Sequence, residues 1–186
     1  MTTLKPTHSA IVNGHTMYKK NLYDANDYKH DVIKKSTNAK LGKKILKGIW
    51  KNHPMYTVTL EARATCTDEC EHYLDCYDNN MPFAHRFKAN QALIDKMAIE
   101  LDKLDKKHPL GYVVRLHILG DFYSVAYVKW WKKQLQTRPN LKIYGYSRNH
   151  VTSKYAKVRS IAKEIVKVRE QFSDRFKIRF SNLPSD

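Results

Sequence analysis

All three cysteines of the chain, Cys66, Cys70 and Cys76, lie within the segment 65–85. Their spacing, C-x3-C-x5-C, allows one loop to present three thiolates to a single metal centre. Thiolates are soft ligands that suit both zinc and iron–sulfur clusters. Because CTDECEHYLDC is a polar run, it is typical of an exposed or site-facing loop and not of cysteines buried as small apolar side chains. The spacing therefore predicts a metal site.

Zinc and iron–sulfur would use this loop differently. A structural zinc site needs a fourth ligand, which His72, His85 or His117 could supply. An iron–sulfur cluster could instead use the three thiolates and leave one iron open. In a reducing compartment, cysteines this close together favour metal or redox chemistry over a disulfide framework. A zinc site and an iron–sulfur cluster therefore both stay as hypotheses for the cysteine loop.

The charge of the chain is strongly uneven. Its 186 residues, enough for one domain with a small extension, contain 34 Lys and Arg against 18 Asp and Glu, a formal net charge of +16. Such a field attracts polyanions, of which nucleic acid is the commonest. No apolar run approaches the roughly 20 residues that cross a membrane, so we expect no membrane partner. The N-terminal MTTLKPTHSA lacks the apolar core of a signal peptide, so we expect a cytoplasmic protein.

Strands and helices are expected to alternate from residue 56 onward. Alternating polar and apolar residues predict strands, and apolar residues at helical spacing predict the helices between them. Right-handed crossovers then give an α/β fold with a parallel sheet of about four strands. The expected strands are 56–64, 111–122, 141–146 and 175–181, and the expected helices are about 84–107, 153–172 and one that Ser124 caps and Pro139 ends.

Only one side of each expected strand is apolar. Val114, Leu116 and Ile118, for example, alternate with Arg115 and His117. A sheet covered on both faces would have strands apolar on both sides, so this pattern predicts a half-barrel with helices on one face and an open, polar, concave face. An ordinary solvated sheet face is the alternative, and a register shift of one residue would exchange the faces. The expected open side carries Glu61, as a partner for Arg115, together with Arg63, Tyr144, Tyr146, Lys177, Arg179 and Ser181.

The first 51 residues are interpreted as a basic N-terminal arm, and 52–186 as the half-barrel core. The arm holds eleven lysines, and AKLGKKILKGIW at 39–50 is expected to form a short helix. These lysines, with Lys154, Lys157 and Lys163 on the outer face of the third helix, could contact phosphates or simply form a solvated surface.

The layout resembles the radical S-adenosylmethionine enzymes, in which the cluster cysteines follow the first strand and a Gly-Gly-Glu-like motif ends the second. Gly120-Asp121, within LHILGDFYS, stands where that motif would stand. The resemblance implies an iron–sulfur cluster on the three cysteines and contacts from Gly120 and Asp121 to S-adenosylmethionine. It also implies that Arg115, His117, Asp121 and Tyr144 face the substrate as catalytic residues.

A closer resemblance is to a phage and prophage family called gene product 88. It is carried by AKLGK at 39–43, by Cys76-Tyr77, by RLHILGDFYS at 115–124 and by YGYS at 144–147, and covers roughly residues 36–181. The resemblance implies a phage-type origin and therefore a location in the host cytoplasm.

Three functions follow as hypotheses. The first is an iron–sulfur protein of radical S-adenosylmethionine type that modifies a nucleic acid or a protein. The second is a non-catalytic nucleic-acid-binding protein whose cysteine loop is folded by zinc. The third is a basic module that binds a host protein. Whether the protein is an enzyme stays open, and an uncovered sheet edge could also form a homodimer.

Overall fold

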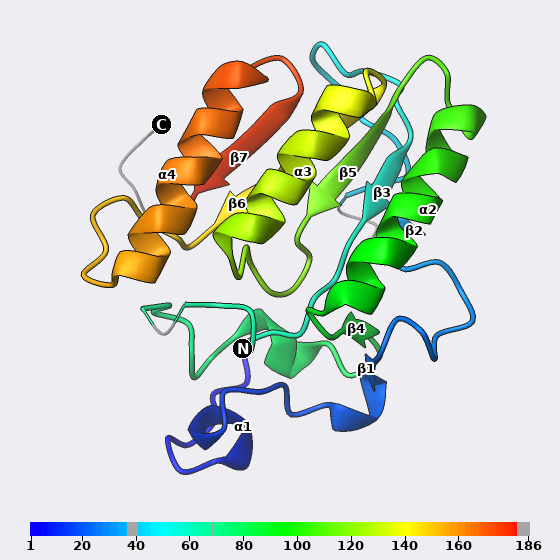
Figure 1. Ribbon diagram of the computed structural model, residues 1–186. Coiled ribbons are helices and arrows are strands. Elements are labelled where there is room, and N and C mark those ends of the chain that lie inside the picture. Colours follow the sequence, from blue (N-terminus) through cyan, green and yellow to red (C-terminus); the bar gives the residue numbers. More distant parts are fainter. Residues whose placement is uncertain (37–40, 68, 182–186) are drawn as a thin grey trace.

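A five-stranded sheet in the order β2-β3-β5-β6-β7 forms the centre of the protein (Figure 1). The structure is a computed structural model that describes residues 1–36, 41–67 and 69–181. Strands β3, β5, β6 and β7 run parallel to one another, and β2 runs antiparallel to β3. The strands are β2 (Lys34–Lys35), β3 (Met55–Thr57), β5 (Tyr112–Leu116), β6 (Leu141–Ser147) and β7 (Phe176–Phe180). The predicted α/β class is confirmed, but the sheet is mixed and has five strands, so the four-stranded parallel half-barrel is not.

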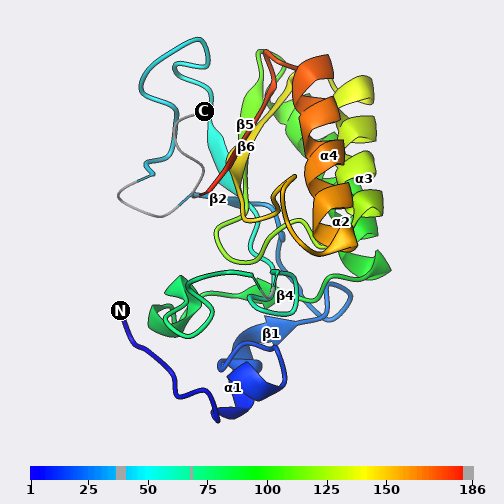
Figure 2. The same cartoon turned by 90° about the vertical axis from the view of Figure 1, so that its left-hand side faces the viewer.

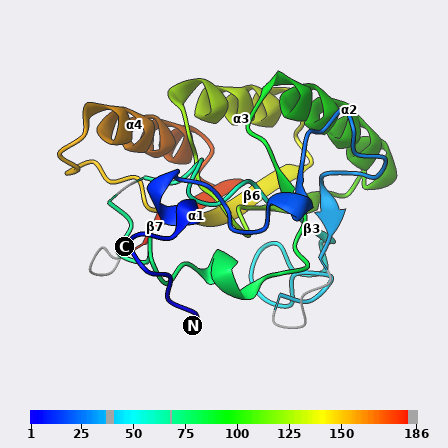
Figure 3. The same ribbon diagram turned by 90° about the horizontal axis from the view of Figure 1, so that it is seen from below.

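Three long helices cover one face of this sheet, as expected (Figure 2). They are α2 (Gln91–Lys107), α3 (Val125–Thr137) and α4 (Ala156–Gln171). Asn90 and Ser124 cap the first two, because their side chains accept hydrogen bonds from the backbone N–H groups of Leu93 and Tyr127. Figure 3, seen from below, shows the three helices side by side in one row.

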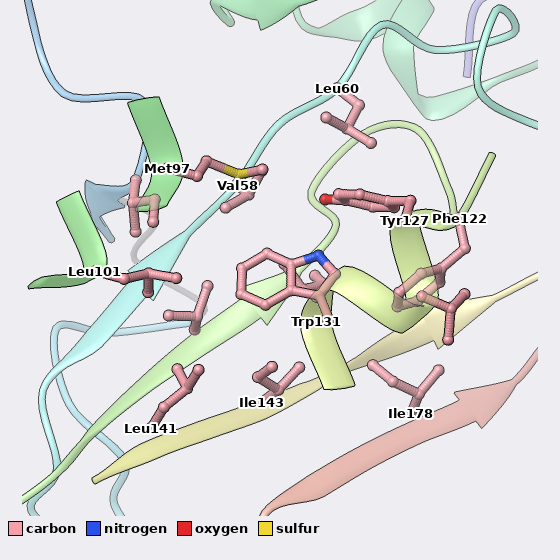
Figure 4. Close-up of a cluster of buried hydrophobic side chains, with 14 of the residues drawn as sticks. Val58, Leu60, Met97, Leu101, Phe122, Tyr127, Trp131, Leu141, Ile143 and Ile178 are labelled. Atoms are coloured by element: carbon pink, nitrogen blue, oxygen red, sulfur yellow. The ribbon is translucent and has the colours of Figure 1, made fainter. Parts of the chain in front are cut away.

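Apolar residues from the helices and from one side of each strand form the core between these two layers (Figure 4). Trp131 of α3 is fully buried there, among side chains such as Leu101 of α2 and Ile143 of β6. The arm also contributes, since Val32 and Ile33 are buried in the same core. Both are held by Glu100 of α2, whose carboxylate accepts the N–H of Val32 at 2.9 Å and that of Ile33 at 2.7 Å.

Below the carboxyl ends of the strands, the N-terminal residues together with residues 58–67 and 69–90 form a second, smaller part of the fold (Figure 1). Its elements are α1 (Ser9–Val12), β1 (Leu22–Tyr23), β4 (Arg86–Phe87) and two 3-10 helices, η1 (Lys19–Asn21) and η2 (Tyr77–Asn80). Strands β1 and β4 pair in parallel. No helix in the described parts of the chain is both long and apolar enough to cross a membrane.

Buried charges hold this smaller part together. Asp78 and Arg86 are both fully buried, and the Asp78 Oδ1 lies 2.5 Å from the Arg86 Nε. The second carboxylate oxygen of Asp78 accepts the hydroxyl of Thr16 at 2.8 Å and lies 3.7 Å from the Nη1 of Arg63. Removing the carboxylate would leave two guanidinium groups buried without their counter-charge, so Asp78 is a structural residue.

Several predicted elements have different limits. The strand expected at 56–64 ends at Thr57. Beyond it, the chain makes isolated hydrogen bonds to β5 and to the residues that follow β5, such as Leu60 N–H to the Leu119 carbonyl, and it turns at 62–65. The helix expected from residue 84 begins at Gln91, after β4. The helix expected at 39–50 is wrong for 41–50, which contain a turn and an isolated bridge between Lys44 and Pro54, while residues 39 and 40 lie outside the described residues.

Candidate functional site

The cysteine loop and the end of β5 meet at the carboxyl edge of the sheet, as the sequence predicted. The Thr65 hydroxyl accepts the N–H of Asp121 at 3.2 Å and donates to the Glu61 carbonyl at 2.7 Å. Gly120 has φ of +80°, and a Cβ there would lie 2.4 Å from the Thr65 Oγ1, so only glycine permits this approach. Gly120 and Asp121 therefore stand beside the loop that starts at Thr65.

Asp121 is buried and held by backbone groups from two loops. Its Oδ1 accepts the N–H of Phe122 and its Oδ2 the N–H of Arg148, both at 2.6 Å. Burial raises the pKa of Asp121 to about 6, although these two hydrogen bonds lower it in part. Through this carboxylate, the loop that follows β5 is tied to the loop that follows β6. The catalytic and cofactor-binding roles predicted for Asp121 stay predictions.

The three cysteines are free thiols, each half-buried. Burial raises the pKa of Cys66 well above its usual range, and the nearby Asp121, Cys76 and Cys70 raise it further. Burial also raises the pKa of Cys76. Among the residues that the structure describes, which exclude Asp68 in this loop, no group of three or more His, Cys, Asp or Glu side chains is arranged to hold a metal ion. The predicted metal centre is thus not preformed here, and metal binding stays a prediction.

The three histidines considered as a fourth ligand lie in separate surroundings. His72 is exposed in the loop, and its Nδ1 lies 3.1 Å from the Asp75 carboxylate. His85 hydrogen-bonds through Nδ1 to the Tyr28 hydroxyl at 2.6 Å, with the Lys34 Nζ at 3.0 Å. His117 packs against α3. Of the three, His72 is the one that lies between the cysteines along the chain.

His117 does not share a face with Arg115, so that prediction is wrong. Strand β5 ends at Leu116, and alternation holds only within the strand. The ring of His117 lies 3.1 Å through Nε2 from the Tyr127 hydroxyl of α3 and 5.0 Å, centre to centre, from Phe122. Burial lowers the pKa of His117 to about 3, so the ring is neutral at physiological pH.

Two other residues expected on the open side lie elsewhere. Glu61 does not pair with Arg115; its Oε1 lies 2.9 Å from the His15 Nδ1. Arg63 is only 3% exposed, has φ of +64°, and donates to the Tyr73 carbonyl and the Asn79 side chain. Both come after β3 has ended, where a strand pattern no longer fixes side-chain direction.

Within the strands, the predicted alternation is correct, and the side opposite the helices carries basic and aromatic residues, with the buried Met55 and Val113 among them. Arg115, Tyr144 and Lys177 lie in one row across β5, β6 and β7, next to Thr57 of β3. The Arg115 guanidinium lies 6.0 Å from the centre of the Tyr144 ring, a cation–π contact. We call this side, opposite the helices, the open face, and it carries Thr57, Arg115, Lys142, Tyr144, Tyr146, Lys177 and Arg179.

A groove that the sequence did not predict extends the open face past β7, the last strand of the sheet. It has a volume of about 700 Å³ and lies between β7 and the segment 45–50. The Trp50 indole N–H donates to the Asp174 carbonyl at 3.0 Å, which fixes that segment beside the strand. Sequence pattern could not reveal this groove, because the segment contains no regular element. The described lining includes Lys47, Trp50, Arg169, Lys177 and Arg179.

The family model for Gene product 88 matches residues 31–168 of the chain. The match runs from before β2 into α4 and supports the phage family expected from the sequence motifs. Nothing in the comparisons supports the radical S-adenosylmethionine resemblance. No curated protein and no solved structure matches the chain.

Proposed function

The chain belongs to the Gene product 88 family, and from the chemistry of its open face we propose that it binds single-stranded nucleic acid there. The observation that carries this proposal is the row of Arg115, Tyr144 and Lys177 across three neighbouring strands. Proteins that bind single strands combine cations that follow the backbone with aromatic rings on which bases stack. The open face has both.

The strands of the sheet contribute charge of one sign to this side. None of the five strands of the sheet contains an Asp or Glu residue. The segment that precedes β3 lies on the same side of the sheet, opposite the helices (Figure 2), and adds the exposed lysines Lys43, Lys44, Lys47 and Lys51. A cationic field over a surface of this kind both attracts a polyanion and speeds its encounter.

The aromatic rings favour a single strand over a duplex. Tyr146 is 51% exposed on β6, and Arg179 lies beside it on β7. Tyr144, two residues earlier, is oriented by its hydroxyl, which donates to the Met55 sulfur at 3.1 Å. Stacking of one base on such a ring contributes about 1–3 kcal/mol, but the bases of a duplex are already stacked on each other.

We expect the variant Lys177→Glu/Arg179→Glu to bind a labelled single-stranded oligonucleotide at least about tenfold more weakly than the wild type, since two phosphate-facing cations are replaced by anions. Fluorescence anisotropy with DNA, RNA and duplex of one sequence, between about 50 and 200 mM salt, measures this. The wild-type affinity should fall linearly on a log–log plot against salt concentration.

The matched control is Lys154→Glu/Lys163→Glu, which changes the net charge equally. Both residues are exposed: Lys163 lies on α4, which covers the opposite side of the sheet (Figure 2), and Lys154 lies in the loop just before that helix. The sequence alone expected them to contact phosphates, so this control also tests that hypothesis. A loss as large as that of the open-face variant, or no binding by the wild type at low salt, would overturn the proposal.

A second proposal, metal binding by the cysteine loop, rests on one specific observation. Cys70 and Cys76 are both near enough to Cys66 to raise the pKa of its thiol, and none of the three is in a disulfide. A metal would have to displace protons from thiols that burial keeps protonated and draw their side chains together, so its binding would be coupled to a change in the loop. Zinc and an iron–sulfur cluster both suit such ligands.

Single replacements of Cys66, Cys70 and Cys76 by serine should each lower bound metal and thermal stability together, because metal binding and folding of the loop are coupled. Metal and sulfide analysis of anaerobically purified protein measures the first effect and a thermal melt the second. Iron with sulfide indicates a cluster, and zinc alone indicates a structural site. If all three variants retain the wild-type metal content, the cysteines are not the ligands.

A further inference from the structure

A pocket of about 410 Å³ lies at the carboxyl edge of the parallel strands, between the cysteine loop, the loops that follow β5 and β6, and the first turns of α4. Crevices at this edge are where α/β sheets bind small ligands, and this volume is within the usual range. The open face, by contrast, is formed by side chains along the strands. The described lining of the pocket includes Arg63, Thr67, Tyr73, Tyr123, Tyr155 and Lys157.

The charged residues in the described lining are both cations. Lys157 is exposed at the start of α4, whereas Arg63 is buried. Arg63 is held in place by hydrogen bonds from Nε to the Tyr73 carbonyl at 3.2 Å and from Nη2 to the Asn79 side chain at 2.7 Å. Its Nη1 makes no hydrogen bond, although the Asp78 carboxylate lies 3.7 Å away. Because Arg63 and Arg86 share the single carboxylate of Asp78, one positive charge stays unbalanced beside this wall, although the Nη1 atom itself is covered.

The helix α4 strengthens this preference for an anion. It is 16 residues long, and its first turn, including Lys157 and Val158, lines the pocket. Its N-cap residue, Tyr155, makes no capping hydrogen bond through its side chain. The positive end of the helix dipole favours negative charge at this wall, where the Ser153 hydroxyl already accepts the Tyr155 N–H and bonds to the Glu69 carboxylate. The carboxylate of Asp121, the residue before Phe122, already accepts two backbone N–H groups.

The other walls suit a planar ring. Four aromatic side chains, Tyr73, Phe122, Tyr123 and Tyr155, line the pocket. Thr67 adds a hydroxyl, whereas the Asn149 amide already donates to the Phe122 carbonyl and the Ser147 hydroxyl and so holds this wall in place. A ligand that satisfies both sets of walls has an aromatic ring at one end and a strongly anionic group at the other.

We propose that this pocket binds a nucleotide unit, with its base against the aromatic walls and its phosphate toward Arg63, Lys157 and the start of α4. The unit could be a free nucleoside monophosphate or the 5′-phosphorylated end of a nucleic-acid strand. Only the second source rests on the proposed function. The shared chemistry is a base and a terminal phosphate joined by one sugar.

Isothermal titration of the full chain with each of the four common nucleoside 5′-monophosphates tests the pocket. At least one should bind saturably with one site per chain, and the corresponding nucleoside, without phosphate, should bind at least about tenfold more weakly. Lys157→Glu should reduce the affinity by a similar factor. Tyr155→Leu should reduce it about fivefold or more through lost stacking, since leucine, like Tyr155, makes no capping hydrogen bond through its side chain.

Lys163→Glu is the matched control, because Lys163 is exposed on the same helix but does not line the pocket. It should change the affinity less than about twofold, as expected for a charge screened by salt. No saturable binding of any monophosphate, or an equal loss in Lys163→Glu, overturns the proposal.

Titration with one oligonucleotide, with and without a 5′-phosphate, separates the two sources. If the 5′-phosphate increases the affinity for the oligonucleotide and Lys157→Glu abolishes that increase, the pocket is assigned to strand ends. Monophosphate binding without such a gain assigns it to the free nucleotide, and either result supports the pocket. Because the monophosphate titration contains no oligonucleotide, monophosphate binding can fail while oligonucleotides still bind the open face. The reverse can also occur.

Discussion

Replacing Gly145 with alanine is expected to prevent stable folding. Gly145 lies opposite Leu116 where β5 and β6 pair, and an added Cβ would stand 1.4 Å from the Leu116 carbonyl oxygen. Because that atom belongs to the backbone, no side-chain rotation can relieve the overlap, and the two central strands would have to separate. We expect a loss of about 4 kcal/mol or more in the free energy of unfolding, measured by urea denaturation.

Gly48→Ala is the control for the chemistry of the substitution. A Cβ at Gly48 would meet nothing within 4 Å, so only its φ of +79° opposes alanine, at a cost of about 1–2 kcal/mol. If Gly145→Ala were no more destabilising than Gly48→Ala, the pairing of β5 with β6 would be wrong. The row of Arg115 and Tyr144 on the open face depends on that pairing.

Acidification is expected to destabilise the protein through His117. Burial lowers its pKa from the usual 6.5 to about 3 in the folded state. The unfolded chain therefore takes up a proton first as the pH falls, so this contribution to stability is complete above 6.5 and is lost as the pH falls toward 3. Between about pH 8 and about pH 4 the loss from this one residue is about 3 kcal/mol.

Urea unfolding of the wild type and of His117→Phe across this pH range isolates the effect. Phenylalanine keeps a ring against Phe122 and Tyr127 but cannot titrate. The free energy of unfolding of the wild type, relative to that of His117→Phe, should therefore decrease as the pH falls. The opposite contribution of Asp121, whose pKa is raised, is common to both and cancels. Parallel pH curves would mean that His117 is solvated in the folded protein, as the simple alternation from Arg115 had predicted.

The contrast between Lys177 and His117 shows how far sequence pattern predicts this fold. In β6 and β7 every second residue points to the core, so Tyr144, Tyr146, Lys177 and Arg179 could be assigned to the other side from the sequence. His117 continues the same pattern on paper, but it follows the last residue of β5. Periodicity does not reveal where a strand stops when polar and apolar residues keep alternating beyond its end.

The cysteine loop shows a second limit. Its position beside Gly120 was predictable, because a strand and its neighbour in a parallel sheet end at the same edge. The partners of the residues just before it were not, since Glu61 pairs with His15 of the N-terminal residues and Arg63 with Asp78, beyond the three cysteines. Such contacts depend on how the N-terminal residues pack below the sheet, and no local pattern encodes that. The groove beside Trp50 was missed for the same reason.

Crosslinking locates the nucleic-acid interface most directly. A single-stranded oligonucleotide that contains 5-bromouracil, irradiated in complex with the wild-type protein and analysed by mass spectrometry, reports which side chains contact the bases. We predict crosslinks to Tyr144 or Tyr146 of β6 or to Trp50 beside β7, which salt and the Lys177→Glu/Arg179→Glu variant both reduce. Crosslinks confined to α2, α3 and α4, on the other side of the sheet, would contradict the assignment of the open face.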